Sequence, residues 1–371
     1  MRTLSIAGKW RWGPLLAALL GTPIAFANAT DLAAEILSAT GVHGGLVVQL
    51  NCRDGALAAA LRASDAYVVH GLARTSDELA RARQTVRDQG LYGPVSVDLI
   101  HDDVLPCIDN SVNLLVCDGP PHVPEEEIMR VLVPRGVAYV RPSDQWTETT
   151  KPWPEDRDEW THYLHDAGNN AVAHDTAIGP PRHLQWDGAP RYSRHHEFTL
   201  SVAAMASAPG RRFSIVDMGS RASIYMPPEW RLTARDAFNG IVLWERPIAS
   251  WFNHLWPLTD EPAQRSWSPD RPTCWMRTKP STGPATRMSW PGSSSRATTY
   301  AGRDGAPLMG LSAKDGRARF LFRLPALPVW DGLAVAEHRV FVSTQDGSVT
   351  CLAGRSRPSA AARQRPHLPL R

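Results

Sequence analysis

Residues 113–142 read NLLVCDGPPHVPEEEIMRVLVPRGVAYVRP, and this stretch decides the fold of the first part of the chain. It opens with an apolar run that ends at Asp118 and Gly119, as in a short strand buried on both faces. Glutamates at 125–127 then begin an amphipathic segment, which predicts a helix over 125–136, because acidic residues favour the first turn of a helix. A second apolar run follows at 137–142. The order strand, helix, strand predicts one unit of a parallel sheet.

The same alternation extends upstream. Apolar runs predict three more strands, and helical spacing predicts two more helices: strands at 45–50, 66–72 and 95–100, and helices at 56–63 and 76–90. For the second helix, Thr75 or Ser76 is the expected N-cap, and Gly90 is the expected stop. The sequence therefore predicts an α/β domain over about 32–141.

Two segments of this domain resemble class I SAM-dependent methyltransferases. The stretch DDVLPCIDNSVNLLVCDG at 102–119 is similar to the family's acidic-loop segment, D-x-x-x-L-P-F-x-D-x-S-F-D. The stretch EEEIMRVLVPRGVAYV at 125–140 is similar to its late helix and strand, which carry R-V-L-x-P-G-G. The resemblance covers about 32–141 and implies a Rossmann-like, methyltransferase-type domain.

The cofactor loop departs from the family pattern, which is an acid on the first strand followed by Gly-x-Gly-x-Gly. The matching residues are VVQLNCRDG, with Gln49 in place of the acid and with Asn51 and Arg53 in place of the first two glycines. Only Gly55 is kept. Those glycines let the backbone approach a ligand without a Cβ in the way. Ala73 stands where a carboxylate would bind the ribose hydroxyls.

These losses predict a domain without cofactor or catalysis. SAM is also a cytosolic cofactor, which an exported chain would not meet. The alternative is an active SAM-dependent methyltransferase. In that case the residues expected to line the cofactor pocket are Asn51, Asp54, Gly55 and Asp103.

A change in composition marks the end of this domain. Residues 30–145 contain no Trp, whereas 146–330 contain twelve of the fourteen in the chain. The stretch 142–157 is rich in Pro and charge, which predicts a linker. Short β-like runs with turns then predict an all-β region over 158–354.

Residues 234–244 read ARDAFNGIVLW, in which Asn239 and Gly240 are typical of a two-residue hairpin turn. The stretch resembles the blade repeat of PQQ-like β-propellers, A-x-D-x-x-[TN]-G-x-x-x-W. The resemblance implies that Asp236 accepts hydrogen bonds in the turn and that Trp244 packs between blades.

The stretches 310–325 and 331–354 are similar to the same repeat, yet the predicted propeller is incomplete. A ring needs at least four blades, and 262–309 shows no alternation of polar and apolar residues. We expect 262–309 to be irregular or disordered, through a reading-frame slip, an internal deletion or an inserted segment. The basic tail, 355–371, is expected to be disordered.

The first 29 residues have the pattern of an export signal. Basic residues precede an apolar run at 13–27, and Ala27-Asn28-Ala29 supplies small residues for cleavage. The run is shorter than the roughly 20 residues that span a bilayer. We therefore expect cleavage after Ala29, a periplasmic or secreted product, and no stable membrane span afterwards. An uncleaved anchor is the alternative.

Six histidines fall between 162 and 196. No metal site is expected, because closeness in sequence does not make side chains converge on one ion, and the histidines are expected to bond loop backbone. If a metal were bound, His162 and His165 would be the candidate ligands. The segment 159–186, followed by SRHHE at 193–197, is similar to exported proteins that join PQQ-like repeats to a methyltransferase-like front. A polar cluster at 191–197 suits an anionic ligand such as PQQ, but no vicinal Cys pair or calcium set accompanies it, so bound PQQ is not expected.

The chain is therefore predicted to be a non-catalytic exported scaffold or binding protein, with other proteins as partners of the propeller. A SAM-dependent methyltransferase and a PQQ-dependent dehydrogenase-like protein are the alternatives. A net charge of +3 and the lack of a basic stripe with aromatics exclude a nucleic-acid partner. Three cysteines, Cys52, Cys107 and Cys117, lie in or beside apolar runs and are expected to be buried.

Overall fold

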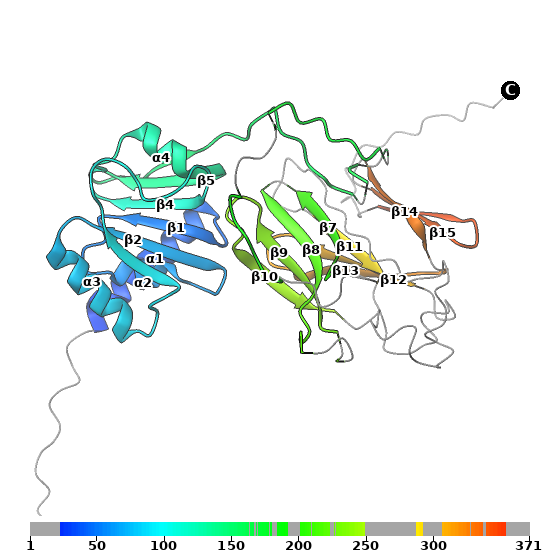
Figure 1. Ribbon diagram of the computed structural model, residues 1–371, viewed down its shortest axis with the longest axis horizontal. Helices are drawn as coiled ribbons and strands as arrows, with labels where there is room; N and C mark the ends of the chain where they lie inside the picture. The colour runs from blue at the N-terminus through cyan, green and yellow to red at the C-terminus, as the bar shows by residue number, and fades with distance from the viewer. Residues whose placement is uncertain are drawn as a thin grey trace, which may run out of the picture.

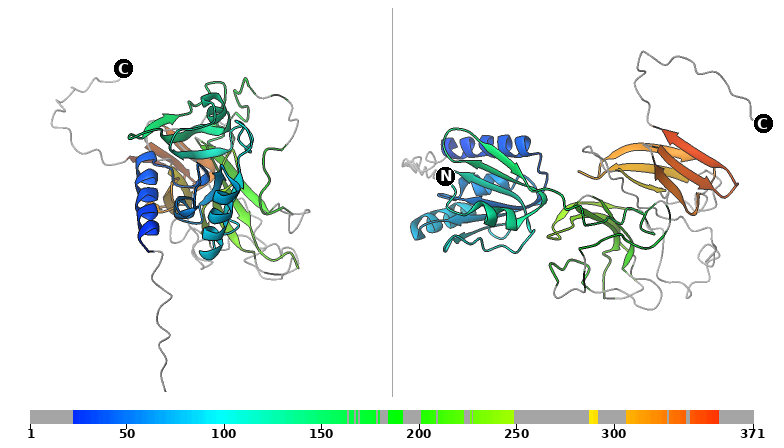
Figure 2. Two further views of the ribbon diagram at one scale, coloured as in Figure 1. Left: turned by 90° about the vertical axis from the view of Figure 1, so that its left-hand side faces the viewer. Right: turned by 90° about the horizontal axis from the view of Figure 1, so that it is seen from above.

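The computed structural model of the 371-residue chain describes four ranges of residues, three of them with short gaps. These are 23–191 without 163, 167, 169, 178 and 180–183; 201–248 without 209, 223–225 and 227; 287–291; and 306–353 without 327, 337 and 338. Figure 1 shows an α/β part and a group of antiparallel sheets side by side, and the view from above in Figure 2 agrees.

The α/β part is a six-stranded sheet with the order β3-β2-β1-β4-β5-β6. Strands β1 to β5 are parallel and β6 is antiparallel to β5. The elements are α1 (Pro23–Thr40), β1 (Gly45–Leu50), α2 (Ala56–Leu61), β2 (Tyr67–Ala73), α3 (Ser76–Asp88), β3 (Val95–Leu99), β4 (Val112–Asp118), α4 (Glu125–Val131), β5 (Leu132–Arg141) and β6 (Thr147–Thr150). The order reverses between β1 and β4, which is the arrangement of a Rossmann-like domain. This confirms the predicted Rossmann-like fold.

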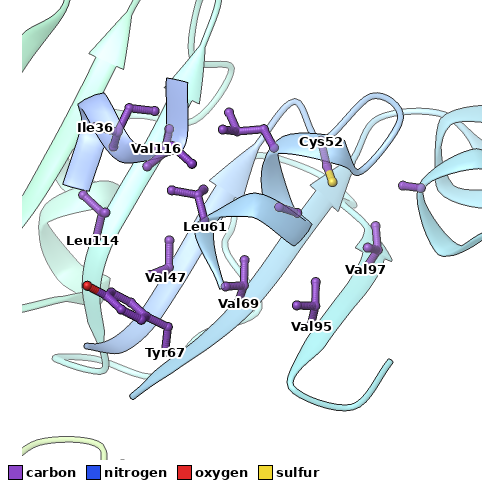
Figure 3. Close-up of a cluster of buried hydrophobic side chains, with 14 of the residues drawn as sticks. Ile36, Val47, Cys52, Leu61, Tyr67, Val69, Val95, Val97, Leu114 and Val116 are labelled. Atoms are coloured by element: carbon purple, nitrogen blue, oxygen red, sulfur yellow. The ribbon is translucent and has the colours of Figure 1, made fainter. Parts of the chain in front are cut away.

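The central strands are buried on both faces because their apolar side chains alternate between two cores. On β4, Leu114 and Val116 pack with α1, α2 and α3, as Figure 3 shows for the first core. Their neighbours Leu115 and Cys117 pack on the other face with α4. Each such side chain contributes about 1.5–3 kcal/mol when fully buried, so this sheet supplies a core of its own.

The ends of α3 follow the sequence. The hydroxyl of Thr75 accepts a hydrogen bond from the Glu78 N–H at 3.2 Å, which confirms Thr75 as the N-cap. Gly90 adopts a left-handed φ of 68° after the last turn. The Leu91 N–H then donates to the Val86 carbonyl at 3.0 Å, which closes the helix.

Two predicted boundaries are wrong. The helix predicted at 125–136 ends at Val131, and β5 begins at Leu132, because Pro134 disfavours helical backbone at the residue before it. The predicted linker 142–157 contains β6, which pairs with β5. Trp146, beside β6, stacks on Tyr139 with ring centroids 4.6 Å apart. The sheet therefore continues to Thr150.

The rest of the described chain forms three antiparallel sheets, with orders β10-β9-β8-β7, β11-β12-β13 and β14-β15-β16. The strands are β7 (Val202–Ala208), β8 (Arg211–Asp217), β9 (Trp230–Asp236), β10 (Val242–Pro247), β11 (Arg287–Pro291), β12 (Ala306–Ser312), β13 (Ala318–Leu324), β14 (Pro328–Ala336), β15 (Arg339–Thr344) and β16 (Val349–Ala353). Leu311 of the second sheet shares a core with the first, and Leu308 and Leu324 share one with the third. The sheets stack in chain order, and a closed propeller stays a prediction.

The segment predicted as irregular, 262–309, contains β11 and the start of β12, so that prediction is wrong for these residues. Five residues, RMSWP, alternate between polar and apolar side chains before the proline, and this run is too short to stand out from its Ser- and Pro-rich surroundings. The remainder of 262–309 lies outside the described residues, as does the predicted disordered tail.

In each of the first two antiparallel sheets, a tryptophan from an earlier segment of the chain packs on the glycine of a hairpin turn. The Trp244 indole N–H donates to the Ala313 carbonyl at 2.9 Å, and its ring lies against Gly316. The Trp186 indole donates in the same way to the Ala237 carbonyl at 3.0 Å and lies against Gly240. The predicted packing of Trp244 between sheets is confirmed.

The turn between β9 and β10 differs from the two-residue hairpin predicted at Asn239 and Gly240. Its loop has four residues, since the Asp236 N–H donates to the Ile241 carbonyl and Gly240 alone has a positive φ, 73°. The Asp236 carboxylate accepts from the N–H groups of Phe238 and Asn239 at 2.8 and 3.0 Å, as predicted.

This turn docks on the edge of the Rossmann-like sheet at which the parallel strands begin. Asn113 of β4 is at the centre of the contact. Its Nδ2 donates to Asp236 Oδ2 at 2.6 Å, and its Oδ1 accepts from Asn239 Nδ2 at 2.7 Å and from the Leu46 N–H at 2.8 Å. Asn239 Nδ2 also donates to the Ser111 carbonyl at 2.8 Å. Four side-chain hydrogen bonds thus tie these residues together.

Gly45 makes room for this contact. Its φ is 101°, and a Cβ at this position would overlap the amide group of Asn113. Burial raises the pKa of Asp236, and the hydrogen bond from Asn113 opposes that rise by stabilising the carboxylate.

Replacing Asn113 tests whether this docking stabilises the protein. The substitution Asn113→Ala leaves buried partners without a hydrogen bond, each at a cost of about 1–3 kcal/mol. We expect a lower urea midpoint and faster tryptic cleavage at the exposed Arg157 in the connecting segment. Asn170→Ala, at an exposed asparagine, is the matched control. Equal midpoints for the two variants would show that the contact adds no stability.

Candidate functional site

The candidate site is a pocket of about 260 Å³ where β1 and β2 end, beside the point at which the strand order reverses. Open α/β sheets bind ligands at this place. The pocket is lined by Leu50, Asn51, Leu72, Arg74, Ile100, Asp102, Asp103, His122 and Val123.

The loop after β1 keeps a glycine-like backbone without the glycines. Asn51 has a φ of 54° and Arg53 a φ of 42°, both in the left-handed region. These are the positions at which the methyltransferase pattern has glycine. A non-glycine residue in this region costs on the order of 1–3 kcal/mol, with Asn at the cheaper end. The loop therefore has a left-handed backbone conformation that costs free energy, and it presents two polar side chains.

Both side chains reach across to the end of β4. Arg53 Nη2 donates to the Asp118 carbonyl at 3.3 Å, and the same nitrogen lies 3.8 Å from the Cβ position of Gly119. Asn51 Nδ2 lies 3.4 Å from both the Pro120 carbonyl oxygen and Cys117 Sγ. The crevice between β1 and β4 is therefore bridged by protein side chains.

The structure brings two of the four predicted pocket residues together. Asn51 and Asp103 line the pocket, whereas Asp54 and Gly55 do not. Asp54 Oδ1 accepts from the Ala56 N–H at 3.1 Å, at the start of α2. Gly55 has a φ of 79°, and a Cβ there would lie 2.9 Å from the backbone of Ala82 in α3. Gly55 thus permits close packing of helix and loop.

Sequence reasoning missed Arg74 and His122. Arg74 follows directly after β2, one residue beyond Ala73. The pocket is therefore lined by the first residue after the strand and not by its last residue. Its N–H donates to Glu78 Oε2 at 3.0 Å. His122 lies in the loop after β4, within a Pro-rich run whose path the sequence does not predict.

Gln49, at the position of the family's acid, is buried at 4% exposure. Its Oε1 has no hydrogen-bond partner among the described residues. A buried carbonyl oxygen without a donor is unfavourable. Gln49 is therefore a remnant polar position inside the β1 strand.

The predicted metal ligands separate. His165 lies with Asp158 and His174, and their potential ligand atoms are within 4.8 Å of one another. His162 is not in this group. Its N–H donates to the His165 carbonyl at 3.0 Å, and its Nδ1 lies 2.7 Å from Thr161 Oγ1. Of the two candidate ligands, only His165 therefore lies in the group.

The histidine group holds an ionised carboxylate. Burial opposes ionisation of Asp158, but hydrogen bonds from the His174 and Glu159 N–H groups and from the His165 ring outweigh it and lower the pKa to about 2. The carboxylate is negative throughout the neutral range.

No protein-family model matches the chain, and no curated protein is similar to it in sequence. Several solved structures match its N-terminal third. A SAM-dependent methyltransferase from Aquifex aeolicus is 16% identical, with a TM-score of 0.27 over 32% of this chain and 77% of that one. The [4+2]-cyclase SpnF is 24% identical, with a TM-score of 0.28 over 30% and 43%.

A geranyl diphosphate C-methyltransferase from Streptomyces coelicolor A3(2) is 14% identical, with a TM-score of 0.28 over 30% of this chain and 42% of that one. The chain spans about half the length of the structures it matches, with 57%, 46% and 43% for three of them. The strand order of the α/β part is itself that of a Rossmann-like domain.

Thiol reactivity tests the packing below the pocket. Burial, assisted by nearby carboxylates, raises the pKa of both Cys52 and Cys117 to about 12, so neither forms a thiolate at pH 8. Cys351 is exposed. We expect a brief pulse of iodoacetamide on the native protein to label Cys351 and to leave Cys52 and Cys117 unmodified by peptide mass spectrometry. Equal labelling of all three thiols would contradict the buried core.

Proposed function

We propose that the chain is a non-catalytic exported scaffold, in which the Rossmann-like domain supports antiparallel sheets that bind other proteins. The observation that carries the proposal is the position of Arg53. Its guanidinium bridges from the loop after β1 to the Asp118 carbonyl, across the crevice where a methyltransferase of this fold would hold its cofactor.

The small volume of the remaining pocket supports the proposal. Its volume of about 260 Å³ lies below the roughly 300–1,000 Å³ typical of sites that enclose drug-sized molecules. The ribose-binding carboxylate is absent at Ala73, and Arg74 follows it. One polar loss, at Ala73, and one steric obstacle, at Arg53, thus act against the same ligand.

The opposite edge of the domain has a structural role that supports the proposal. Asn113 and its partners attach the first antiparallel sheet to the start of β1 and β4. The domain therefore positions the sheets through its amino-terminal edge. This use of the fold requires no ligand at the other edge.

One observation favours the alternative, a SAM-dependent methyltransferase. Asn51 and Arg53 keep the left-handed backbone of a glycine loop, and Asp102 and Asp103 line the pocket where an adenine amine would be bound. The unpartnered Gln49 Oε1 is a second polar position in the same region. In this function SAM would supply the methyl group, and these side chains would hold its polar edges.

Titration calorimetry of the full chain with SAM separates the two functions. We expect the wild type to bind SAM more weakly than about 1 mM, which corresponds to about −4 kcal/mol. Arg53→Gly removes the bridge and the strained φ, so binding should become at least ~10-fold tighter, or about 1.4 kcal/mol. Arg81→Ala, an exposed arginine of α3 away from the pocket lining, is the control.

Micromolar binding by the wild type would overturn the non-catalytic proposal and favour the methyltransferase. If Arg53→Gly and Arg81→Ala bind equally weakly, the guanidinium is not the obstacle.

Export is part of the proposal. Residues 1–22 lie outside the described residues, and the proposed cleavage site after Ala29 falls within α1. Beyond that site, Ala33 and Ile36 of α1 pack in the first core. Cleavage would therefore keep the packed part of the helix. None of the described helices has the length and apolarity to cross a membrane.

N-terminal sequencing of the protein purified after expression with its complete leader tests export. The expected first residue is Thr30, in the periplasmic fraction or the medium. Ala27→Leu should block processing, because the cleavage position requires a small side chain. A wild-type product that begins at Met1 would contradict cleavage.

A further inference from the structure

Residues 158–174 fold back on themselves beside the first antiparallel sheet. The Trp160 N–H donates to Ser207 Oγ at 2.8 Å, and the Ser207 N–H donates to the Trp160 carbonyl at 2.7 Å. Ser207 belongs to β7, the edge strand of that sheet. This anchor places Asp158, His165 and His174 at the sheet's edge.

The three side chains converge on one point. His165 Nε2 lies 2.7 Å from Asp158 Oδ2, and His174 Nδ1 lies 3.3 Å from the same oxygen. Two ligands bound tetrahedrally at about 2.0–2.1 Å from a zinc ion are roughly 3.3 Å apart. The two distances to Asp158 Oδ2 are therefore within about 0.7 Å of this value, and the potential ligand atoms of the two histidines lie within 4.8 Å of each other.

The buried member of the group is oriented as a metal ligand. The side chain of His165 is 4% exposed, and its Nδ1 has no hydrogen bond among the described residues. Asp166 Oδ2 lies 3.8 Å from that nitrogen. Histidines that bind a metal through one nitrogen commonly direct the other at a carboxylate. The pair of His165 and Asp166 has this arrangement.

The opposite side of the group faces solvent. The His174 side chain is 72% exposed and that of Asp158 is 27% exposed. The Asp158 carboxylate is held in place by the N–H groups of His174 and Glu159, at 2.8 and 2.7 Å. A fixed carboxylate, a buried imidazole and an accessible imidazole leave one coordination position for water.

We propose that Asp158, His165 and His174 bind a divalent first-row transition metal ion, with zinc as the expected occupant. Two imidazoles and one carboxylate suit this class of ion, whereas Mg²⁺ and Ca²⁺ prefer all-oxygen sites. A metal ion on His165 Nε2 takes the place of the N–H that faces Asp158, and the neutral imidazole then carries its single proton on Nδ1, on the side of Asp166.

The ion would fasten the 158–174 segment over the edge of β7. An exposed edge strand presents unpaired backbone groups to other chains. Ion binding to the folded state alone also stabilises that state. Metal binding would therefore hold the 158–174 segment more firmly against the edge strand β7. This role involves no catalytic step.

Metal titration of the full chain, stripped with chelator, tests the site. Co²⁺ is the spectroscopic probe and Zn²⁺ the competitor. We expect one equivalent of Co²⁺ to give visible absorption bands that Zn²⁺ abolishes, and Zn²⁺ to raise the thermal midpoint. Exposed His174→Ala should weaken Co²⁺ binding by ~100-fold or more, and Mg²⁺ or Ca²⁺ in excess should not compete.

Two controls make the result specific. His101→Ala removes an exposed histidine outside the group, and a double change of His195 and His196 to Ala removes the vicinal pair in the sequence. Both variants should bind Co²⁺ like the wild type. If His174→Ala binds as tightly as the wild type, or if the double variant loses the bands, the assignment is wrong. A wild type that binds no Co²⁺ also overturns it.

Discussion

The side chain of Asn113 is the contact through which the two parts of this protein hold together. One amide group accepts from the Leu46 N–H of β1 and from Asn239 of the turn, and donates to the carboxylate of Asp236. It can do so because Gly45 leaves the space that any side chain would fill. Its partners come from two segments, β1 and the turn between β9 and β10. The position of every later sheet follows from this contact, because the sheets stack on one another in chain order.

The two ends of the parallel strands in the Rossmann-like sheet consequently have different roles. The amino-terminal edge is used for attachment, and the other edge keeps the outline of a ligand site. At the carboxyl ends of the strands, the loop after β1 still has the backbone of a glycine loop. The side chains of Arg53 and Asn51 connect this loop to the end of β4. These hydrogen bonds replace contacts that a bound molecule would make. They connect the loop to the end of β4 through protein atoms alone, as the proposed supporting role requires.

Much of the α/β part could be predicted from the sequence, because its strands are apolar on both faces and its helices carry local end signals such as Thr75 and Gly90. The end of α4 was misplaced because the effect of Pro134 on the residue before it outweighs the helical pattern. The candidate site was predicted only in part. Gly55 follows a ligand-loop pattern, yet it serves contact with α3, and His174 joins His165 through a fold of the chain that no spacing rule describes. Contacts between distant segments, such as Asn113 with Asp236, leave no periodic trace in the sequence.

The tryptophan contacts between successive sheets have a direction. In both cases the indole comes from the earlier segment and the glycine turn from the later one: Trp186 meets Gly240, and Trp244 meets Gly316. For the first two antiparallel sheets, the tryptophan that packs on the turn is thus synthesised before the turn itself. Such a structure grows by addition at its C-terminal side, and a chain that stops early leaves a shorter but internally complete stack. Evolution can therefore shorten or extend a protein of this kind without rebuilding what precedes the change.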